Sequence, residues 1–319
     1  IYYTQNNYQE AVQLYESLIK SSDEELSEEG LYRSALCYLE LQKKDAALDK
    51  LRVLSSRPFK KDRQSRVHAT YFLAAEAMHS NEMAFAKQLF TKIADSTFAD
   101  ADLRKTALIN ILKIEYSAQN FKEALVACEK FIMQFPDDEM IQDVRQQRLL
   151  TVYNLKEYAL FIDLMKDWHK TYPESYILEM DLKLAESFLE LQRYEEALEV
   201  FKRVLEQPQL PVESRYSCLF QEFLCLNYLE RLEELLQKTR QILEEFPNSP
   251  QKGLLLYESG IAAQKLHKHA EATPLLRAAM QYFVGEKENY IESGKGLLNS
   301  LQAIEKWAEA AFVSREIAA

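Results

Sequence analysis

The chain has 319 residues, but only 6 are Gly and 8 are Pro, whereas average usage would give roughly 22 Gly and 16 Pro. Sheet-rich and loop-rich folds need these residues for their turns, so the composition argues against such folds and favours helices joined by short connections. The net charge of −11 argues against nucleic acid as a partner, because phosphate binding needs clustered Lys and Arg.

A short pattern recurs along the whole chain. Its clearest copies are Asn7–Val12, Asn120–Leu125 and Arg193–Leu198, each an aromatic residue, two polar residues, Ala and an aliphatic residue after the first position. Weaker copies complete a series of nine anchor positions: Ala11, Ala47, Ala86, Ala124, Phe161, Ala197, Leu235, Ala272 and Ala310. Successive anchors are 36 to 39 residues apart. So regular a period predicts a repeat protein.

Two further markers keep the same phase and divide each repeat into two helices. Proline follows the anchor by eleven or twelve residues at Pro58, Pro136, Pro173, Pro208 and Pro247. A small residue precedes the anchor by twelve residues at Ala35, Ala74, Ala185 and Gly260. Proline ends a helix, and small residues let two helices approach closely. Each repeat is therefore predicted to be helix A, a tight turn, and helix B carrying the anchor, with the apolar faces buried by stacking.

These residues resemble the tetratricopeptide repeat family over essentially the whole chain. The best matching set is Ala185, Phe188, Tyr194, Ala197 and Phe201, and a second set is Ala35, Tyr38, Ala47 and Leu51. The spacing is two to five residues longer than the usual 34. The turn between helices A and B lacks the expected Gly and carries Gln42, Asn81, Gln119 or Gln192. The longer repeats, with endings such as Phe246–Ser249, resemble the bacterial envelope subset of the family.

The predicted fold is all-α: a right-handed α-α superhelix of about eight full helix pairs, preceded by a truncated first helix. It is treated as one solenoid domain over residues 1–319. Residues 1–5 are expected to form the last turn of that truncated helix. The last helix offers an apolar face that includes Trp307 and Phe312, with no following repeat. We expect a segment of a longer protein, or an end that packs on a partner.

The charged segments are interpreted as parts of the fold and not as binding sites. The acidic run Asp23–Glu29 is predicted to be a solvated, partly helix-capping loop, in preference to a partner-binding patch. The basic segment 59–63 is short and interrupted.

All four cysteines are predicted to be buried small hydrophobes: Cys37, Cys128, Cys218 and Cys225. Cys218 and Cys225 are two helical turns apart, too far for an unstrained disulfide.

The sequence offers no pattern for catalysis, and it predicts neither a cofactor nor a metal site. Six glycines cannot build a phosphate loop, and Gly294–Gly296 is read as a helix start or loop. His267 and His269 fall at a turn between helices, which favours a polar turn over metal ligation. His169 is expected in the last turn of a helix.

A binding surface is what remains. The family resemblance implies that positions fifteen, eleven and eight residues before an anchor line a concave groove. The partner-binding set predicted from these positions is Tyr32, Tyr71, Lys113, Tyr116, Tyr153, Phe220 and Tyr257. Aromatic groove residues bury large area at low entropic cost, which suits peptide or protein recognition. The alternative is that several of these tyrosines belong to the core and only their hydroxyls reach solvent.

The predicted function is a non-catalytic scaffold that binds a protein or peptide on the concave face. Bacterial cell-envelope assembly is the setting that the resemblance implies, with the cytoplasm as the alternative compartment. Two alternatives stay open: a regulatory or targeting region of a larger enzyme, and a homo-oligomer formed through Trp307 and Phe312. No stretch approaches the ~18 apolar residues of a transmembrane helix.

Overall fold

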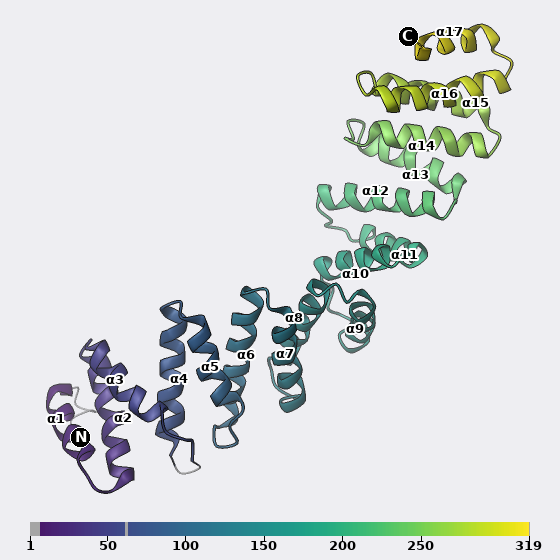
Figure 1. The fold of residues 1–319 in the computed structure, drawn as a ribbon. Coiled ribbons are helices and arrows are strands. Elements are labelled where there is room, and N and C mark those ends of the chain that lie inside the picture. Colours follow the sequence, from purple (N-terminus) through teal and green to yellow (C-terminus); the bar gives the residue numbers. More distant parts are fainter. Residues whose placement is uncertain (1–6, 61–62, 319) are drawn as a thin grey trace. The chain divides into compact units, whose positions relative to one another are not determined.

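The computed structural model describes residues 7–60 and 63–318, and every regular element in these residues is an α-helix. The chain forms two compact units, residues 1–157 and residues 158–319. The helices of each unit can be followed in Figure 1. This confirms the all-α prediction and the division into helix pairs. The truncated helix expected at residues 1–5 lies outside the described residues.

The described part of the first unit begins with a helix B and continues with three helix pairs and a fourth helix A. Its helices are α1 Tyr8–Ile19, α2 Glu24–Glu40, α3 Lys44–Ser55, α4 Gln64–His79, α5 Met83–Ala94, α6 Ala101–Ser117, α7 Phe121–Gln134 and α8 Ile141–Asn154. Each of these helices packs on the next one along the chain, and α2 also contacts α4. This is the nearest-neighbour packing expected of a helical repeat.

The second unit begins with a helix B and adds four helix pairs. Its helices are α9 Tyr158–Thr171, α10 Leu178–Glu190, α11 Tyr194–Leu205, α12 Val212–Tyr228, α13 Leu232–Glu245, α14 Lys252–Lys265, α15 His269–Tyr282, α16 Lys287–Ala303 and α17 Trp307–Ala318. Here too each helix packs on the next, and α14 also contacts α16. His169 lies in the last turn of α9, as predicted.

The anchor residues form the centre of the packing. All nine are buried, with at most 3% of their surface exposed. The small residues twelve positions earlier are buried too, and Gly260 shows why size matters there. A Cβ added at Gly260 would lie 2.5 Å from Cγ of Leu276, on the neighbouring helix α15. The close approach of two helices that the small residues predict is therefore confirmed in this repeat.

Every turn between a helix A and its helix B has the same backbone geometry. One residue in each turn adopts a positive φ between 53° and 63°: Gln42, Asn81, Gln119, Lys156, Gln192, Glu230, His267 and Glu305. In the first such turn, the amide of Gln42 donates to the carbonyl of Leu39 and the amide of Lys43 donates to the carbonyl of Tyr38. The other seven turns repeat both bonds. This is a Schellman motif, which normally places Gly at the left-handed position.

Two B helices end just before a proline, as the sequence predicts. Helix α7 ends at Gln134, before Pro136, and α13 ends at Glu245, before Pro247. One expectation about glycine is wrong, because Gly294 and Gly296 lie inside α16 rather than at a helix start or in a loop. They are buried where neighbouring helices approach, and Leu276 lies close to Gly296.

The acidic run is also placed differently from the prediction. Only Asp23 lies before the helix, where its side chain accepts a hydrogen bond of 2.8 Å from the amide of Glu25. The other residues of the run form the first turns of α2, and Glu28 is 1% exposed. The capping role predicted for the run is confirmed at Asp23. The prediction of a solvated loop was wrong for the rest, because these residues are helical and Glu28 is buried against a partner from the next repeat.

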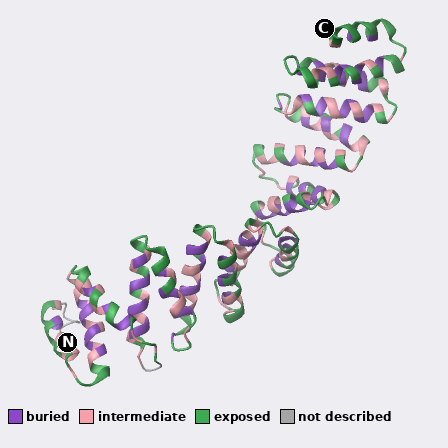
Figure 2. Ribbon diagram, viewed as in Figure 1, coloured by how far each residue is buried: buried purple, intermediate pink, exposed green. Residues whose placement is uncertain are grey.

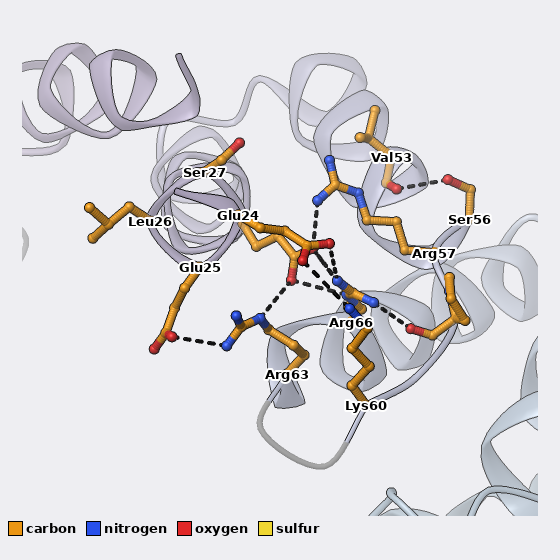
Figure 3. Close-up of polar contacts among 12 residues, drawn as sticks. Glu24, Glu25, Leu26, Ser27, Val53, Ser56, Arg57, Lys60, Arg63 and Arg66 are labelled. Carbon is orange, nitrogen blue, oxygen red and sulfur yellow. Dashed lines mark hydrogen bonds and ion pairs between the residues drawn. The ribbon is translucent and has the colours of Figure 1, made fainter. Parts of the chain in front are cut away.

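That partner is Arg66 of α4, itself 1% exposed. Figure 3 shows its guanidinium pointing toward the carboxylates of α2. It donates to Glu28 at 2.5 Å and to Glu24 at 2.8 Å. The neighbouring basic segment also forms ion pairs with α2, since Lys60 pairs with Glu24 and Arg63 pairs with Glu25. Residues 61 and 62 lie outside the described residues. These opposite charges join two successive repeats.

The four cysteines are free and buried, as predicted. Burial raises the pKa of Cys128 to about 12 and the pKa of Cys218 to about 11. Thiols that hold their protons so firmly are poor nucleophiles and poor metal ligands. Their role is that of small apolar side chains between helices.

Candidate functional site

A groove lies between α6 and α8 in the first unit. Helix α6 contributes Ile109, Leu112, Lys113, Tyr116 and Ser117. On the other side lie Met140, just before α8, and Asp143, Val144 and Gln147 of α8. Its volume is about 310 Å³. On each helix these residues recur at intervals of three and four positions, so they form one stripe facing the groove. We call this the α6–α8 groove.

The loop before α8 holds one end of the groove in place. Pro136 prevents α7 from continuing, and Asp138 then organises the turn into α8. The amide of Met140 donates to Oδ1 of Asp138 at 3.0 Å, while Lys105 of α6 donates to Oδ2 at 2.7 Å. The hydrogen bond from Lys105 holds the pKa of Asp138 below its ordinary value. Met140 is thus fixed at the edge of the groove with 37% of its surface exposed.

The floor of the groove is apolar and its sides are charged. Leu112 and Val144 are buried and Ile109 is half-buried. Lys113 on α6 and Asp143 on α8 are exposed, and neither has an ion-pair or hydrogen-bond partner among the described residues. The groove therefore presents one positive and one negative side chain on opposite helices.

Two polar side chains converge on the same groove. The hydroxyl of Tyr116 accepts a hydrogen bond of 3.0 Å from Asn154, and its ring packs edge-on against Phe121 at 5.4 Å. The side-chain nitrogen of Gln147 is buried and has no hydrogen-bond partner in the part of the chain that the structure describes. A buried donor without a partner costs free energy that a ligand carbonyl would recover.

Two of the seven predicted binding residues, Lys113 and Tyr116, meet in this groove, and the others in the first unit lie elsewhere. Tyr71 is half-buried with its ring against Phe90 of the core, at 6.2 Å. The ring of Tyr32 lies 6.1 Å from that of His68 and is partly covered by the core. Tyr153 is half-buried on α8 but does not line the groove.

The predicted residues of the second unit are engaged in packing. Phe220 is half-buried between the rings of Tyr216 and Phe223, at 6.3 Å and 6.1 Å. Tyr257 packs against the buried cluster formed by Leu256, Ala279 and Phe283, and this burial raises the pKa of the Tyr257 hydroxyl. Both residues thus serve the packing of their own repeats.

The two terminal candidates are exposed on α17. Trp307 is 62% exposed and Phe312 is 59% exposed, while Ala310 and Val313 are the buried residues of this helix. Figure 2 shows how little of α17 is buried. Both aromatic side chains therefore lie at the surface of α17.

Clustered metal ligands and membrane-spanning helices are both absent from the described residues. Residues 7–60 and 63–318 hold no group of three or more His, Cys, Asp or Glu side chains arranged to bind a metal ion. His267 and His269 lie in and just after a turn, as predicted, with ring centres 6.3 Å apart. None of the described helices is both long enough and apolar enough to cross a membrane.

Of the residues that line the groove, only Lys113 and Tyr116 were predicted from the sequence. Ile109 stands fifteen residues before its anchor, Lys113 eleven and Tyr116 eight, so α6 supplies all three positions that the family pattern implies. Met140, Asp143 and Gln147 stand at other positions near the start of α8. The signal that could have found them is their spacing of three and four residues, which places them on one face.

The fold and the repeated turn define the class of protein: a helical-repeat protein built from helix pairs. Models of the tetratricopeptide repeat match residues 1–59 and residues 179–209. The chain therefore contains sequence matches to the tetratricopeptide repeat in both of its units. A search of curated protein sequences finds no match.

Solved structures of similar fold are numerous, but their sequences are distant. The Naa15/Naa10 complex bound to HypK-THB is 16% identical with a TM-score of 0.53, over 86% of this chain and 39% of that one. YrrB, described as a repeat protein with an unusual peptide-binding site, is 17% identical with a TM-score of 0.46, over 65% of this chain and 97% of its own. The C-terminal part of a repeat protein from Cytophaga hutchinsonii is 18% identical with a TM-score of 0.43, over 78% and 95%. At this identity the likeness concerns the fold alone.

Proposed function

We propose that this protein is a non-catalytic scaffold that binds a peptide segment of a partner protein in the α6–α8 groove. The observation that carries the proposal is an apolar floor flanked by Lys113, Asp143 and Gln147, whose polar groups have no partner among the described residues. Binding pockets typically have this composition, with a few polar groups that fix orientation. Helical-repeat proteins commonly use the surfaces created by stacked repeats for binding.

The proposal is tested by blocking the groove with a charge. Met140→Glu places a carboxylate at the edge of the floor, and because Met140 is already 37% exposed the fold should tolerate it. Met133→Glu is the matched control: Met133 is 74% exposed on α7 and lies outside the groove. Partners are captured from the native lysate and identified, and their affinity is then measured with each variant.

A partner that binds the parent and the Met133→Glu variant equally, but the Met140→Glu variant at least about tenfold more weakly, supports the groove as its site. Such a loss corresponds to about 1.4 kcal/mol. If Met140→Glu binds every captured partner as tightly as the parent does, the groove is not the binding site.

Self-association is a second candidate function, favoured by the two exposed aromatic side chains on α17. A second copy of the chain could cover Trp307 and Phe312, since aromatic side chains are enriched at interfaces. Light scattering across a wide concentration range measures this directly. A mass that rises with concentration and returns to the monomer value in Trp307→Glu would support it, whereas a constant mass in both proteins would exclude it.

The cellular setting stays a proposal based on repeat length. Repeats of 36 to 39 residues resemble the envelope subset of the family, which suggests a role in bacterial cell-envelope assembly. A regulatory or targeting region of a larger enzyme is the alternative. Fractionation of native cells, followed by mass determination of the chain that carries this sequence, distinguishes the two settings.

A further inference from the structure

We infer that the preferred occupant of the α6–α8 groove is an extended peptide with an apolar side chain between one acidic and one basic residue. This inference rests on the proposed function, because it assumes that a peptide enters this groove. It goes further by assigning the chemistry of the peptide. Three features of the groove lead to it: the floor, the charges and the unpaired amide.

The apolar side chain follows from the floor. Leu112 and Val144 close the groove from below and Ile109 is half-buried beside them, so the surface left for contact is mainly apolar. A volume of about 310 Å³ holds one large aliphatic side chain with its backbone. Burying a Leu or Met side chain there removes apolar surface from water and stabilises the complex.

The two flanking charges follow from Lys113 and Asp143. Neighbouring charges on the same helices are already paired, as Lys105 is with Asp138 and Arg148 is with Glu129. Among the described residues, Lys113 and Asp143 are left without partners on opposite sides of the groove. An acidic peptide would be attracted by Lys113 and repelled by Asp143. A basic peptide would be attracted by Asp143 and repelled by Lys113. A peptide with both charges in the matching order satisfies both side chains and discriminates against the others.

The extended conformation follows from the buried amide of Gln147. Its side-chain nitrogen is a donor without a partner among the described residues, so it calls for an acceptor on the ligand. Within a helical ligand most backbone carbonyls are bonded internally, whereas an extended segment offers its carbonyls to the groove. The hydroxyl of Tyr116, which already accepts from Asn154, can donate its own hydrogen to a second carbonyl.

The test uses three labelled synthetic peptides in fluorescence anisotropy at low salt. The first has the order Glu-Ser-Leu-Ser-Lys between Gly-Ser ends, the second reverses Glu and Lys, and the third replaces both by Ser. Reversing Glu and Lys in the peptide replaces two attractive contacts with Lys113 and Asp143 by two repulsive ones. Surface pairs contribute up to about 1 kcal/mol each, so we expect one order to bind about tenfold more tightly than the other.

The decisive variant is Lys113→Glu combined with Asp143→Lys, which exchanges the two charges of the groove. Both residues are exposed, so the fold should persist, and circular dichroism verifies this. The preference between the two charged peptides should reverse, while the neutral peptide should bind both proteins equally. A second variant, Lys113→Gln with Asp143→Asn, should remove the preference without reversing it.

The outcomes separate this inference from the proposed function. Met140→Glu should weaken binding of all three peptides if the groove is their site. If Met140→Glu weakens all three but the charge exchange leaves the preference unchanged, the charge assignment is overturned and the groove stands. If Met140→Glu has no effect on bound peptides, the groove itself is wrong. Failure of both charged peptides to bind the parent protein at millimolar concentration also overturns the inference.

Discussion

At the scale of single residues, the ion pair between Arg66 and Glu28 is buried on both sides, with each side chain 1% exposed. Removing two charges from water is costly, and only good geometry repays that cost. Here the geometry is complete, because Arg66 also donates to Glu24 at 2.8 Å and to the carbonyl of Pro58 at 2.6 Å. Glu28 receives a further bond of 2.5 Å from Arg57. The group thus connects α2, the loop after α3, and α4.

Arg66→Ala should destabilise the first unit by about 3 kcal/mol. Removing one partner of a buried ion pair typically costs about 3–5 kcal/mol, and we expect the lower end because Arg57 continues to pair with Glu28. Arg52→Ala is the control: it breaks the exposed pair with Asp49 and should change stability by less than about 0.5 kcal/mol. Urea unfolding followed by circular dichroism measures both, and equal losses would contradict the proposed importance of burial.

The same group predicts a dependence on pH. Burial would raise the pKa of Glu28, but hydrogen bonds from Arg66 and Arg57 outweigh it, so the pKa lies below the ordinary value of 4.5. A carboxylate whose pKa falls on folding adds stability above its unfolded pKa, and that stability is lost as the pH falls through the folded pKa. Glu28→Gln should therefore lose stability at pH 7 and show a shallower decline below pH 4.5 in acid titrations of the unfolding midpoint. An unchanged slope would show that other carboxylates control the acid limb.

At the scale of secondary-structure elements, the eight turns between helices A and B carry a shared backbone cost. Each has a residue other than Gly in the left-handed region, where a side chain costs roughly 1 kcal/mol or more. The two Schellman hydrogen bonds of each turn hold this conformation. The turn is thus set by its position in the repeat and not by the local preference of its residue.

Gln119→Gly should stabilise the protein by about 1 kcal/mol, since Gly adopts a positive φ without steric cost. The same change in a helix interior should do the opposite. Gln88 is exposed in the middle of α5, and Gln88→Gly should destabilise by about 1 kcal/mol. The pair is compared by thermal and urea unfolding; a destabilised Gln119→Gly protein would mean that the side chain of Gln119 contributes contacts of its own.

At the scale of the whole molecule, packing runs mainly between neighbouring helices within each of two compact units. Stability in such a chain is approximately a sum of local terms. The chain offers a natural probe of this, because both tryptophans lie in the second unit. Trp168 is 4% exposed and Trp307 is 62% exposed, so the fluorescence change on unfolding should come mainly from Trp168.

Arg66→Ala should therefore affect two spectroscopic signals differently. Circular dichroism reports all helices, and part of its transition should move to lower urea concentration. The fluorescence transition of Trp168 should keep its midpoint, because the substitution lies in the first unit. If both signals move together, the two units unfold as one cooperative domain, as the single domain expected from the sequence would.

Much of the fold follows from the sequence because it depends on local rules repeated many times. The spacing of Ala47, Ala86 and Ala124 predicts the helix pairs, and Pro136 and Pro247 predict where B helices end. Each of these signals acts within a few residues and recurs in phase, so weak copies support one another. The small residues twelve positions before the anchors, such as Ala74 and Gly260, likewise predict where two helices approach closely.

The tertiary structure alone decided which surfaces stay free. Tyr71 and Phe220 occupy positions that the family pattern assigns to a groove, yet Phe90 and Phe223 pack against them. Arg66 reaches Glu28 across 38 residues of sequence, and α8 brings Asp143 and Gln147 beside Lys113. A repeat period specifies helices and their order, because these depend on local contacts. Burial, pairing and an open groove depend on which side chains of neighbouring repeats meet, and only the packed helices determine that.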